Sequence, residues 1–122
     1  MKRCYSLKKN SEFQYVYRAG KRFSGRAMAL VALRSRNAVR VGFSIGKKVG
    51  NAVVRNRVKR RLRECVRPLL PRLRPCRLVF IAREELAQES FADMQKTVRY
   101  LIKKADVLAP DDTGAIAKRT QP

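Results

Sequence analysis

The sequence has no histidine and no tryptophan, and only nine of its 122 residues are acidic. Without histidine, the chain cannot supply an imidazole base, a histidine metal ligand, or a nucleophile activated by histidine. A two-metal nuclease would need converging carboxylates that hold ions about 4 Å apart. Most of the acids instead lie on or just before the predicted last helix, where they suit a solvated helix start. The sequence therefore predicts no catalytic centre, and another molecule must supply the chemistry of any reaction in which the protein takes part.

Long hydrophobic runs are also missing. No apolar run approaches the roughly 18 to 20 residues of a membrane-spanning helix. The first ten residues, MKRCYSLKKN, carry positive charge with no apolar stretch behind them, unlike a secretory signal. We therefore expect a cytoplasmic protein without a membrane partner.

Cysteine is scarce and odd in number. Cys4, Cys65 and Cys76 show none of the C-x-x-C spacing of metal or redox sites. We expect reduced thiols and no disulfide-linked partner. Cys65 falls on the apolar side of a predicted helix, which favours a small buried side chain.

Positive charge, in contrast, is abundant. With 30 lysines and arginines, the formal net charge is +21 and the pI is about 11.2. This excess exceeds what solubility requires and indicates a polyanionic partner, of which nucleic acid is the commonest. Apolar residues make up 45% of the chain, which is enough for an ordinary core. We predict one RNA-binding domain over residues 1–107 and a disordered tail over residues 108–122.

The charge is densest from Lys47 to Arg67, with nine basic residues and one acid. Within this region the turn GKKVGN leads into a predicted basic helix, for which Asn51 is a candidate N-cap and whose end Pro68 and Pro71 limit. The pattern predicts a helix with one packed face and one charged face. On a helical period the apolar residues gather on one side: Val54, Val58, Leu62, Cys65, Val66 and Leu69.

Shorter patterns surround the basic helix. Residues 10–19 predict a helix that is capped by Asn10 or Ser11 and ended by Gly20. Ser90 opens a last helix with the S-x-x-D form of a capping box. Both segments carry apolar residues at helical spacing.

Three segments have strand character. Residues 28–33 and 77–82 are apolar runs of strand length, and residues 39–45 alternate strictly, with Phe43 on the core side. The order of elements predicts an α+β fold, an α/β sandwich with a single sheet of about four strands. The general rule for βαβ units predicts a right-handed crossover.

The segment GKKVGNAVVRNRVKRRLRE, led in by VRVGFSI, resembles the signature of the bacterial ribonuclease P protein subunit family. Residues 6–20 are similar to that family's first helix, and LVFIAR at residues 78–83 is similar to its last strand. Together the resemblance covers residues 6–105. A generic basic helix would not reproduce, in the same order, the short residue groups that match the signature. The central matches are Lys47-Lys48, Gly50-Asn51-Ala52, Arg55-Asn56-Arg57 and Lys59-Arg60.

The resemblance implies a fold like domain 2 of ribosomal protein S5, with a left-handed βαβ crossover in place of the right-handed default. It also implies an endoribonuclease in which this chain is the non-catalytic subunit. The partners would be a catalytic RNA and precursor tRNA, whose 5′ leader is removed to give the mature 5′ end. Mg²⁺ held mainly by RNA would supply the chemistry, which suits a chain without histidine.

Two sets of site residues follow from the resemblance. From the residue pattern alone, Phe13 and Tyr17, which are four positions apart, would more often be core residues. The resemblance instead favours contact of both rings with the leader and leaves Val16 as the core residue of this helix. Aromatic rings stack on any unpaired base, which suits leaders of varied sequence. The predicted leader-binding cleft contains Phe13, Tyr17, Val31 and Arg40. The predicted RNA-binding residues are Lys47, Lys48, Asn51, Arg55, Asn56, Arg57, Lys59, Arg60, Arg61 and Arg63.

Two alternative functions share some of these features. A small ribosomal or RNA-packaging protein without a role in cleavage would share the charge, but packaging gives no reason for aromatic residues beside a basic cleft. A protein-only nuclease would cleave without any RNA subunit. Reconstitution of cleavage with a catalytic RNA separates the three functions.

Overall fold

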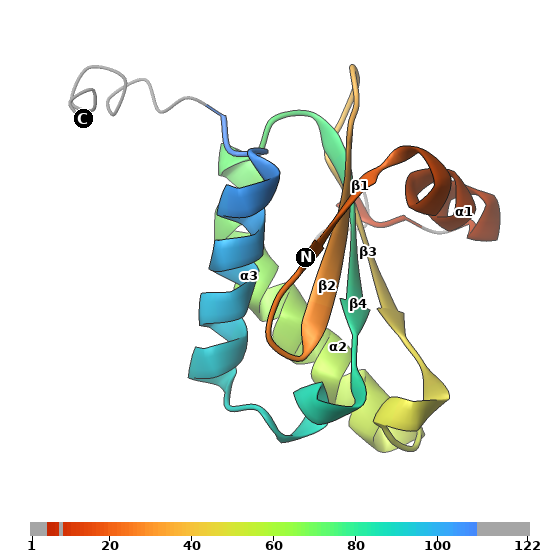
Figure 1. Cartoon of the computed structure of the whole chain (residues 1–122), viewed down its shortest axis with the longest axis vertical. Helices are drawn as coiled ribbons and strands as arrows, with labels where there is room; N and C mark the ends of the chain where they lie inside the picture. Colours follow the sequence, from red (N-terminus) through yellow and green to blue (C-terminus); the bar gives the residue numbers. More distant parts are fainter. Residues whose placement is uncertain (1–4, 8, 110–122) are drawn as a thin grey trace.

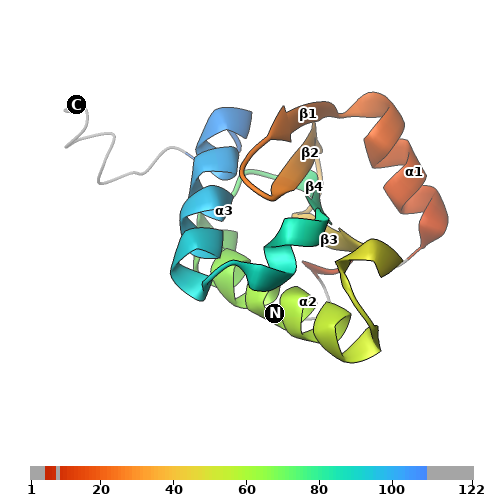
Figure 2. The same ribbon diagram turned by 60° about the horizontal axis from the view of Figure 1, so that its bottom comes forward.

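The computed structural model describes residues 5–7 and 9–109. A four-stranded sheet separates two layers of helix (Figures 1 and 2). On one face lies α1 (Asn10–Ala19), and on the other lie α2 (Ala52–Val66) and α3 (Phe91–Ala105). Short 3₁₀ segments complete this part of the chain: η2 (Lys47–Val49), η3 (Arg67–Arg72) and η4 (Glu84–Gln88). The predicted α+β sandwich with one sheet is confirmed.

The sheet has the order β1-β2-β4-β3. Its strands are β1 (Lys21–Ser24), β2 (Met28–Arg34), β3 (Arg40–Ile45) and β4 (Cys76–Ala82). β2 pairs antiparallel with β1 and β4, whereas β3 and β4 are parallel. The residue pattern does not delimit β1, because KRFS has a single large apolar residue. That residue, Phe23, lies opposite Leu30 of β2 at the edge of the sheet.

The crossover from β3 through α2 to β4 is left-handed. α2 lies on the same face as α3, and β4 lies between β3 and β2 (Figure 1). Seen from the α2 face with the parallel strands pointing upward, the chain moves left from β3 to β4. The right-handed default is therefore wrong, and the handedness implied by the resemblance is confirmed. This placement gives β4 a paired neighbour on both edges and buries its Leu78, Val79 and Phe80 completely.

The larger core lies between the sheet and the two helices α2 and α3. Leu30 of β2 lies opposite Phe80 of β4 in the register, and both are fully buried. α2 contributes Val58 and Leu62, and α3 contributes Leu101, all at most 1% exposed. Burying a side chain of this size contributes about 1.5–3 kcal/mol. These contacts hold the basic helix against the sheet.

A smaller core lies beneath α1. Val16 is fully buried and packs with Val31 and Val79 of the sheet. The ring of Phe13 lies directly over Gly42 of β3, where an added Cβ would come within 2.6 Å of the ring. Glycine at this position therefore permits the close approach of α1 to β3.

The predicted caps of α2 and α3 are confirmed. The Asn51 side chain accepts a hydrogen bond from the Val54 backbone N–H at 3.0 Å. The Ser90 hydroxyl accepts one from the Asp93 backbone N–H at 3.1 Å. Each bond satisfies a backbone donor that the helix itself leaves unpaired. η3, which contains Pro68, follows α2 directly.

The predicted cap of α1 is wrong by one or two residues. Lys9 occupies the N-cap position, and Asn10 is already helical. The cause is the carboxylate of Glu12, which accepts a hydrogen bond from the Lys9 backbone N–H at 3.1 Å. An acid at the third helical position thus fixes the start of the helix without an Asn or Ser cap.

After α3 the chain runs beside η3. Leu108 forms an isolated antiparallel bridge with Leu73, and the Ala109 backbone N–H donates to the Arg72 carbonyl at 2.6 Å. Both residues fall within the predicted tail, yet both are hydrogen-bonded to the domain. The remainder of the predicted tail, residues 110–122, lies outside the described residues.

Candidate nucleic-acid interface

α2 divides its residues as the helical period predicts. Val54 is half-buried in the first turn, and Leu69 is buried just beyond the helix in η3. The buried stripe fixes α2 to the sheet, so its charged residues are left on the outer side. The residues of the stripe are at most 2% exposed: Val58, Leu62, Cys65 and Val66.

The predicted RNA-binding residues all lie on η2, on α2 or at the cap between them. Their side chains differ in exposure. The exposed ones are Lys47, Lys48, Asn51, Asn56, Arg57 and Arg60. The half-buried ones are Arg55, Lys59, Arg61 and Arg63.

Helical spacing distributes these cations around the outer half of α2. Arg55 and Lys59 are four residues apart and share one flank. With Phe43 of β3 and Asn56 they line a cavity of about 270 Å³. Arg57 is two residues from each of them and therefore lies on the other flank. The helix thus presents positive charge in several directions.

Few charges are neutralised within the described part of the chain. Its ion pairs are Arg26–Glu89 at 3.6 Å, Arg34–Asp106 at 3.5 Å and Arg67–Glu64 at 2.9 Å. Among the described residues, none of the ten predicted RNA-binding residues forms an ion pair with a carboxylate. The buried Nε of Arg55 also lacks a hydrogen-bond partner there. Within the described residues these cations are therefore left without an ion-pair partner, which favours binding of an anion.

Phe43 lies at the margin of the core. It is half-buried, and its ring stacks on Phe80 with centroids 5.9 Å apart and 20° between the planes. The same ring forms a wall of the cavity beside Arg55. The alternation of residues 39–45 correctly places Phe43 on the core face of the sheet, but it cannot show that β3 is an edge strand. That edge position leaves part of the ring uncovered next to the cations.

η2 brings Lys47 and Lys48 to the start of α2. Gly50 joins the two elements with φ of 157°, and an added Cβ would lie 2.7 Å from the Val54 side chain. Glycine is therefore required for both conformation and space. Lys47 and Lys48 also line a second hollow of about 510 Å³, which extends to the end of β4.

α1 presents the predicted aromatic pair on one flank. Phe13 is half-buried, and Tyr17 is 37% exposed. Their ring centroids are 6.4 Å apart and the planes are tilted by 52°. Val31, at 4% exposure, lies beneath α1 in the smaller core, so it supports the helix and offers almost no open surface.

Arg40, the fourth predicted leader residue, is half-buried at the start of β3. It shares a sheet face with Gly42, two residues further on. Its Cα partner in β4 is Arg77, whose guanidinium lies over the ring of Tyr15. Sequence reasoning missed Tyr15 and Arg77, because neither belongs to a motif and they meet only through the fold.

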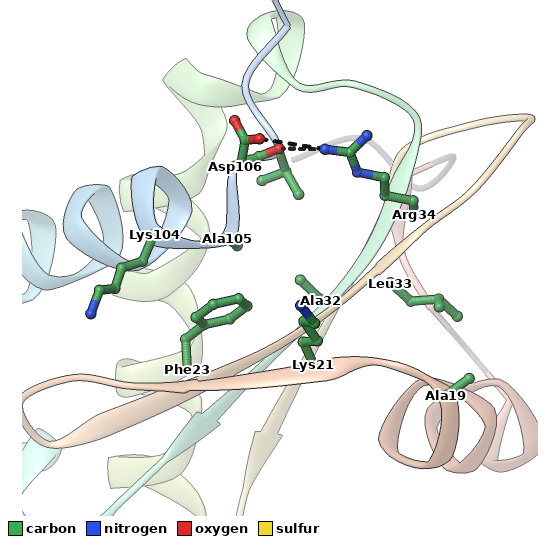
Figure 3. A pocket seen from close by; sticks show the side chains of 10 residues that line it. Ala19, Lys21, Phe23, Ala32, Leu33, Arg34, Lys104, Ala105 and Asp106 are labelled. Atoms are coloured by element: carbon green, nitrogen blue, oxygen red, sulfur yellow. Dashed lines mark hydrogen bonds and ion pairs between the residues drawn. The ribbon is translucent and has the colours of Figure 1, made fainter.

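A further hollow lies between β1, β2 and the end of α3 (Figure 3). Its volume is about 450 Å³, and Lys21, Phe23 and Lys104 border it. The Arg34–Asp106 ion pair spans one side. Its lining comes from residues 19–34 and 104–107, so no local pattern could predict it.

The described cysteines are poorly suited to chemistry. Burial raises the pKa of Cys65 and of Cys76 from 9.0 to about 11. Both are free thiols that stay protonated at neutral pH and are weak nucleophiles. Within residues 5–7 and 9–109, no group of three or more histidine, cysteine or acidic side chains could hold a metal ion. In the same ranges, no helix is long and apolar enough to cross a membrane.

Together, fold and site define a class: a small α+β sandwich in which a strongly cationic helix packs on one face of a sheet and an aromatic-bearing helix packs on the other. The family model described as Ribonuclease P matches residues 1–106. The chain belongs to the ribonuclease P protein family, as the signature between Lys47 and Arg63 indicated.

Individual relatives and solved structures support this family assignment. The ribonuclease P protein component of Symbiobacterium thermophilum is 42% identical over 111 residues, covering 88% of this chain and 96% of the relative. That of Shouchella clausii is 40% identical, with coverage of 90% and 93%. The solved RNase P protein of Staphylococcus aureus is 29% identical with a TM-score of 0.80, covering 85% of this chain and 97% of that one. The Thermotoga maritima protein, at 22% identity and a TM-score of 0.73, shares the fold, with coverage of 81% and 96%.

Proposed function

We propose that this protein is the RNA-binding subunit of a ribonuclease P, and that it promotes endonucleolytic removal of the 5′ leader from precursor tRNA. The observation that carries the proposal is the cationic surface of η2 and α2. In this chain of the ribonuclease P protein family, the lysines and arginines predicted to bind RNA form no ion pair with a carboxylate among the described residues. The cytoplasmic location expected from the sequence stays a prediction.

The surface of η2 and α2 is proposed to bind the catalytic RNA. Arginine is suited to this task because its planar guanidinium can donate two parallel hydrogen bonds to phosphate oxygens. Arg57 and Arg60 are exposed, so phosphate can reach them without rearrangement of the fold. The buried stripe on the other side of α2 holds the helix in place while its outer side binds RNA.

The α1 flank with Phe13 and Tyr17 is proposed to hold the single-stranded leader. Phe13 is anchored over Gly42, and Tyr17 remains open to solvent. Stacking of a base on an aromatic ring contributes about 1–3 kcal/mol and is tolerant of sequence. Leaders of different sequence could therefore bind in the same way.

The protein is not proposed to hold the catalytic metal. Within residues 5–7 and 9–109 no group of three or more histidine, cysteine or acidic side chains could hold a metal ion, and the exposed lysines and arginines of η2 and α2 repel Mg²⁺, so the residues described there do not fit the ion. The Mg²⁺ ions of the reaction are proposed to be held mainly by RNA. The protein's part is then to bind and position the two RNA molecules.

Reconstitution tests this proposal. Purified protein is mixed with the catalytic RNA and precursor tRNA at low Mg²⁺, and leader release is followed over time. We expect faster release than with RNA alone. If the protein gives no gain, a packaging role is favoured and the proposal fails; cleavage by the protein without RNA would instead indicate a protein-only nuclease.

A further inference from the structure

Another cationic hollow, separate from those beside α2, lies on the flank of α1 that is turned away from Phe13 and Tyr17. The helical period places Tyr15 about 160° around α1 from both rings. There the guanidinium carbon of Arg77, on β4, lies 5.8 Å from the centroid of the Tyr15 ring. The hollow has a volume of about 290 Å³ and is lined by Tyr15, Leu33, Arg34, Ser35, Arg36, Asn37 and Arg77.

The lining contains three arginines and no carboxylate. Arg34 is partly neutralised by Asp106, toward which its guanidinium points in Figure 3. Arg36 is exposed on the turn after β2 and, within the described residues, forms no ion pair. Arg77 is half-buried, and its Nε is shielded from solvent without a hydrogen-bond partner. The hollow therefore holds positive charge and an unused buried donor.

Arg40 increases the local charge. It is the Cα partner of Arg77 in the β3–β4 ladder, so the two side chains lie next to each other on the α1 face of the sheet, near the start of both strands. Adjacent like charges in a sheet are unfavourable unless an anion lies between or above them. Tyr15 reduces this cost for Arg77, because the ring face attracts the guanidinium and fixes its plane.

We propose that this hollow binds a backbone phosphate of an RNA strand through Arg77 and Arg36, with Tyr15 as the residue that positions Arg77. The proposal rests on the RNA-binding function above. A phosphate accepts the fork of hydrogen-bond donors that a fixed guanidinium presents. The strand would be either the leader continuing past α1 or a segment of the catalytic RNA, and the experiment distinguishes these two sources.

The first measurement uses inorganic phosphate and the free protein. Arginine Nε–H resonances are followed by ¹H–¹⁵N NMR while phosphate replaces chloride at constant ionic strength. We expect a saturable shift of the Arg77 Nε–H resonance that is lost in Arg36→Gln. The absence of any saturable shift at Arg77 would overturn the site, whatever the protein does in cleavage.

The second measurement uses RNA. Dissociation constants are measured against salt for the catalytic RNA alone, and for precursor and mature tRNA bound to the holoenzyme. Arg36→Gln and Arg77→Gln should each reduce the magnitude of the log–log salt slope by about 0.7, so the affinity should fall about fivefold less over one decade of salt than it does for wild type. The matched control is Arg72→Gln, an exposed arginine in η3 outside the site. A reduced slope for precursor tRNA only identifies the leader as the source of the phosphate. A reduced slope for the isolated catalytic RNA identifies that RNA. Slopes equal to those of Arg72→Gln in every measurement refute the proposal.

Two further comparisons separate binding from folding. Arg36 is exposed on a turn, so Arg36→Gln tests the site even if Arg77→Gln lowers stability. Tyr15→Phe should keep the wild-type slope because the ring remains, whereas Tyr15→Ala should reduce it. If wild-type protein fails to stimulate cleavage, the proposed function fails; if it stimulates cleavage while these variants match Arg72→Gln, only the phosphate site fails.

Discussion

Arg57→Ala tests whether the cations of α2 make individual phosphate contacts or only contribute to a general positive field. Arg57 is exposed and, within the described residues, has no carboxylate partner. Arg67, directly after α2, is the matched control because it already pairs with Glu64 at 2.9 Å. Both substitutions remove one positive charge from the same region of the molecule.

Counterion release gives the expected magnitude. Loss of one phosphate contact reduces the magnitude of the log–log salt slope by about 0.7–0.9, so the affinity for the catalytic RNA falls roughly five- to eightfold less over one decade of salt than it does for wild type. Arg67→Ala should change the slope less, because the Glu64 carboxylate competes with phosphate for that side chain. Loss of the exposed Arg67–Glu64 pair should cost only about 0–1 kcal/mol of stability.

The assay is equilibrium binding of labelled catalytic RNA at several salt concentrations, with thermal unfolding of each variant as the folding control. A larger reduction of the salt slope for Arg57→Ala than for Arg67→Ala supports a direct contact. Equal changes in slope for the two variants would refute this reasoning, because a diffuse field responds to net charge alone.

Three further predictions follow from the same structure. Phe13→Ala combined with Tyr17→Ala should weaken binding of precursor tRNA more than binding of mature tRNA, measured with the holoenzyme; equal losses would argue against a leader site on α1. Gly50→Ala should lower the free energy of unfolding by about 1–3 kcal/mol because of its positive φ, whereas Gly46→Ala, where an added Cβ meets nothing within 4 Å, should not; urea unfolding compares them. The buried Cys65 thiol has its pKa raised from 9.0 to about 11, so its contribution to stability is complete below pH 9 and is lost as pH rises through 11. Urea unfolding from pH 8 to 11 should show a smaller decline for Cys65→Ala than for wild type, and identical declines would contradict the burial of that thiol.

Local signals predicted the elements that surround the site. The strict alternation of residues 39–45 marked β3, and Asn51 and Ser90 marked the starts of α2 and α3, because each signal depends on residues only a few positions apart. The helical spacing of its apolar residues likewise predicted the buried stripe of α2. Such features follow from backbone geometry and do not require knowledge of the neighbouring elements.

Other features depend on contacts between distant segments. The general rule gave the wrong handedness for the crossover, and only the resemblance implied the left-handed form. Tyr15 and Arg77 are 62 positions apart, and no motif links them. Phe43 alternates like a core residue, but its position on an edge strand beside Arg55 leaves it half-buried. Each of these results requires the strand order, which local patterns do not contain.

The same arrangement that suits α2 to RNA also limits the stability of the free protein. The cations of α2 repel one another. Among the described residues, the one ion pair of this helix joins Glu64 to Arg67 just beyond its end, so burial of Val58 and Leu62 must offset the repulsion. Carboxylates placed beside these cations would raise the free energy of unfolding by up to about 1 kcal/mol per exposed ion pair. Every such pair would then have to separate before a phosphate could bind. Unpaired cations on a helix fixed by its apolar side avoid that competition, and bound RNA should in turn stabilise the fold because it binds the native state.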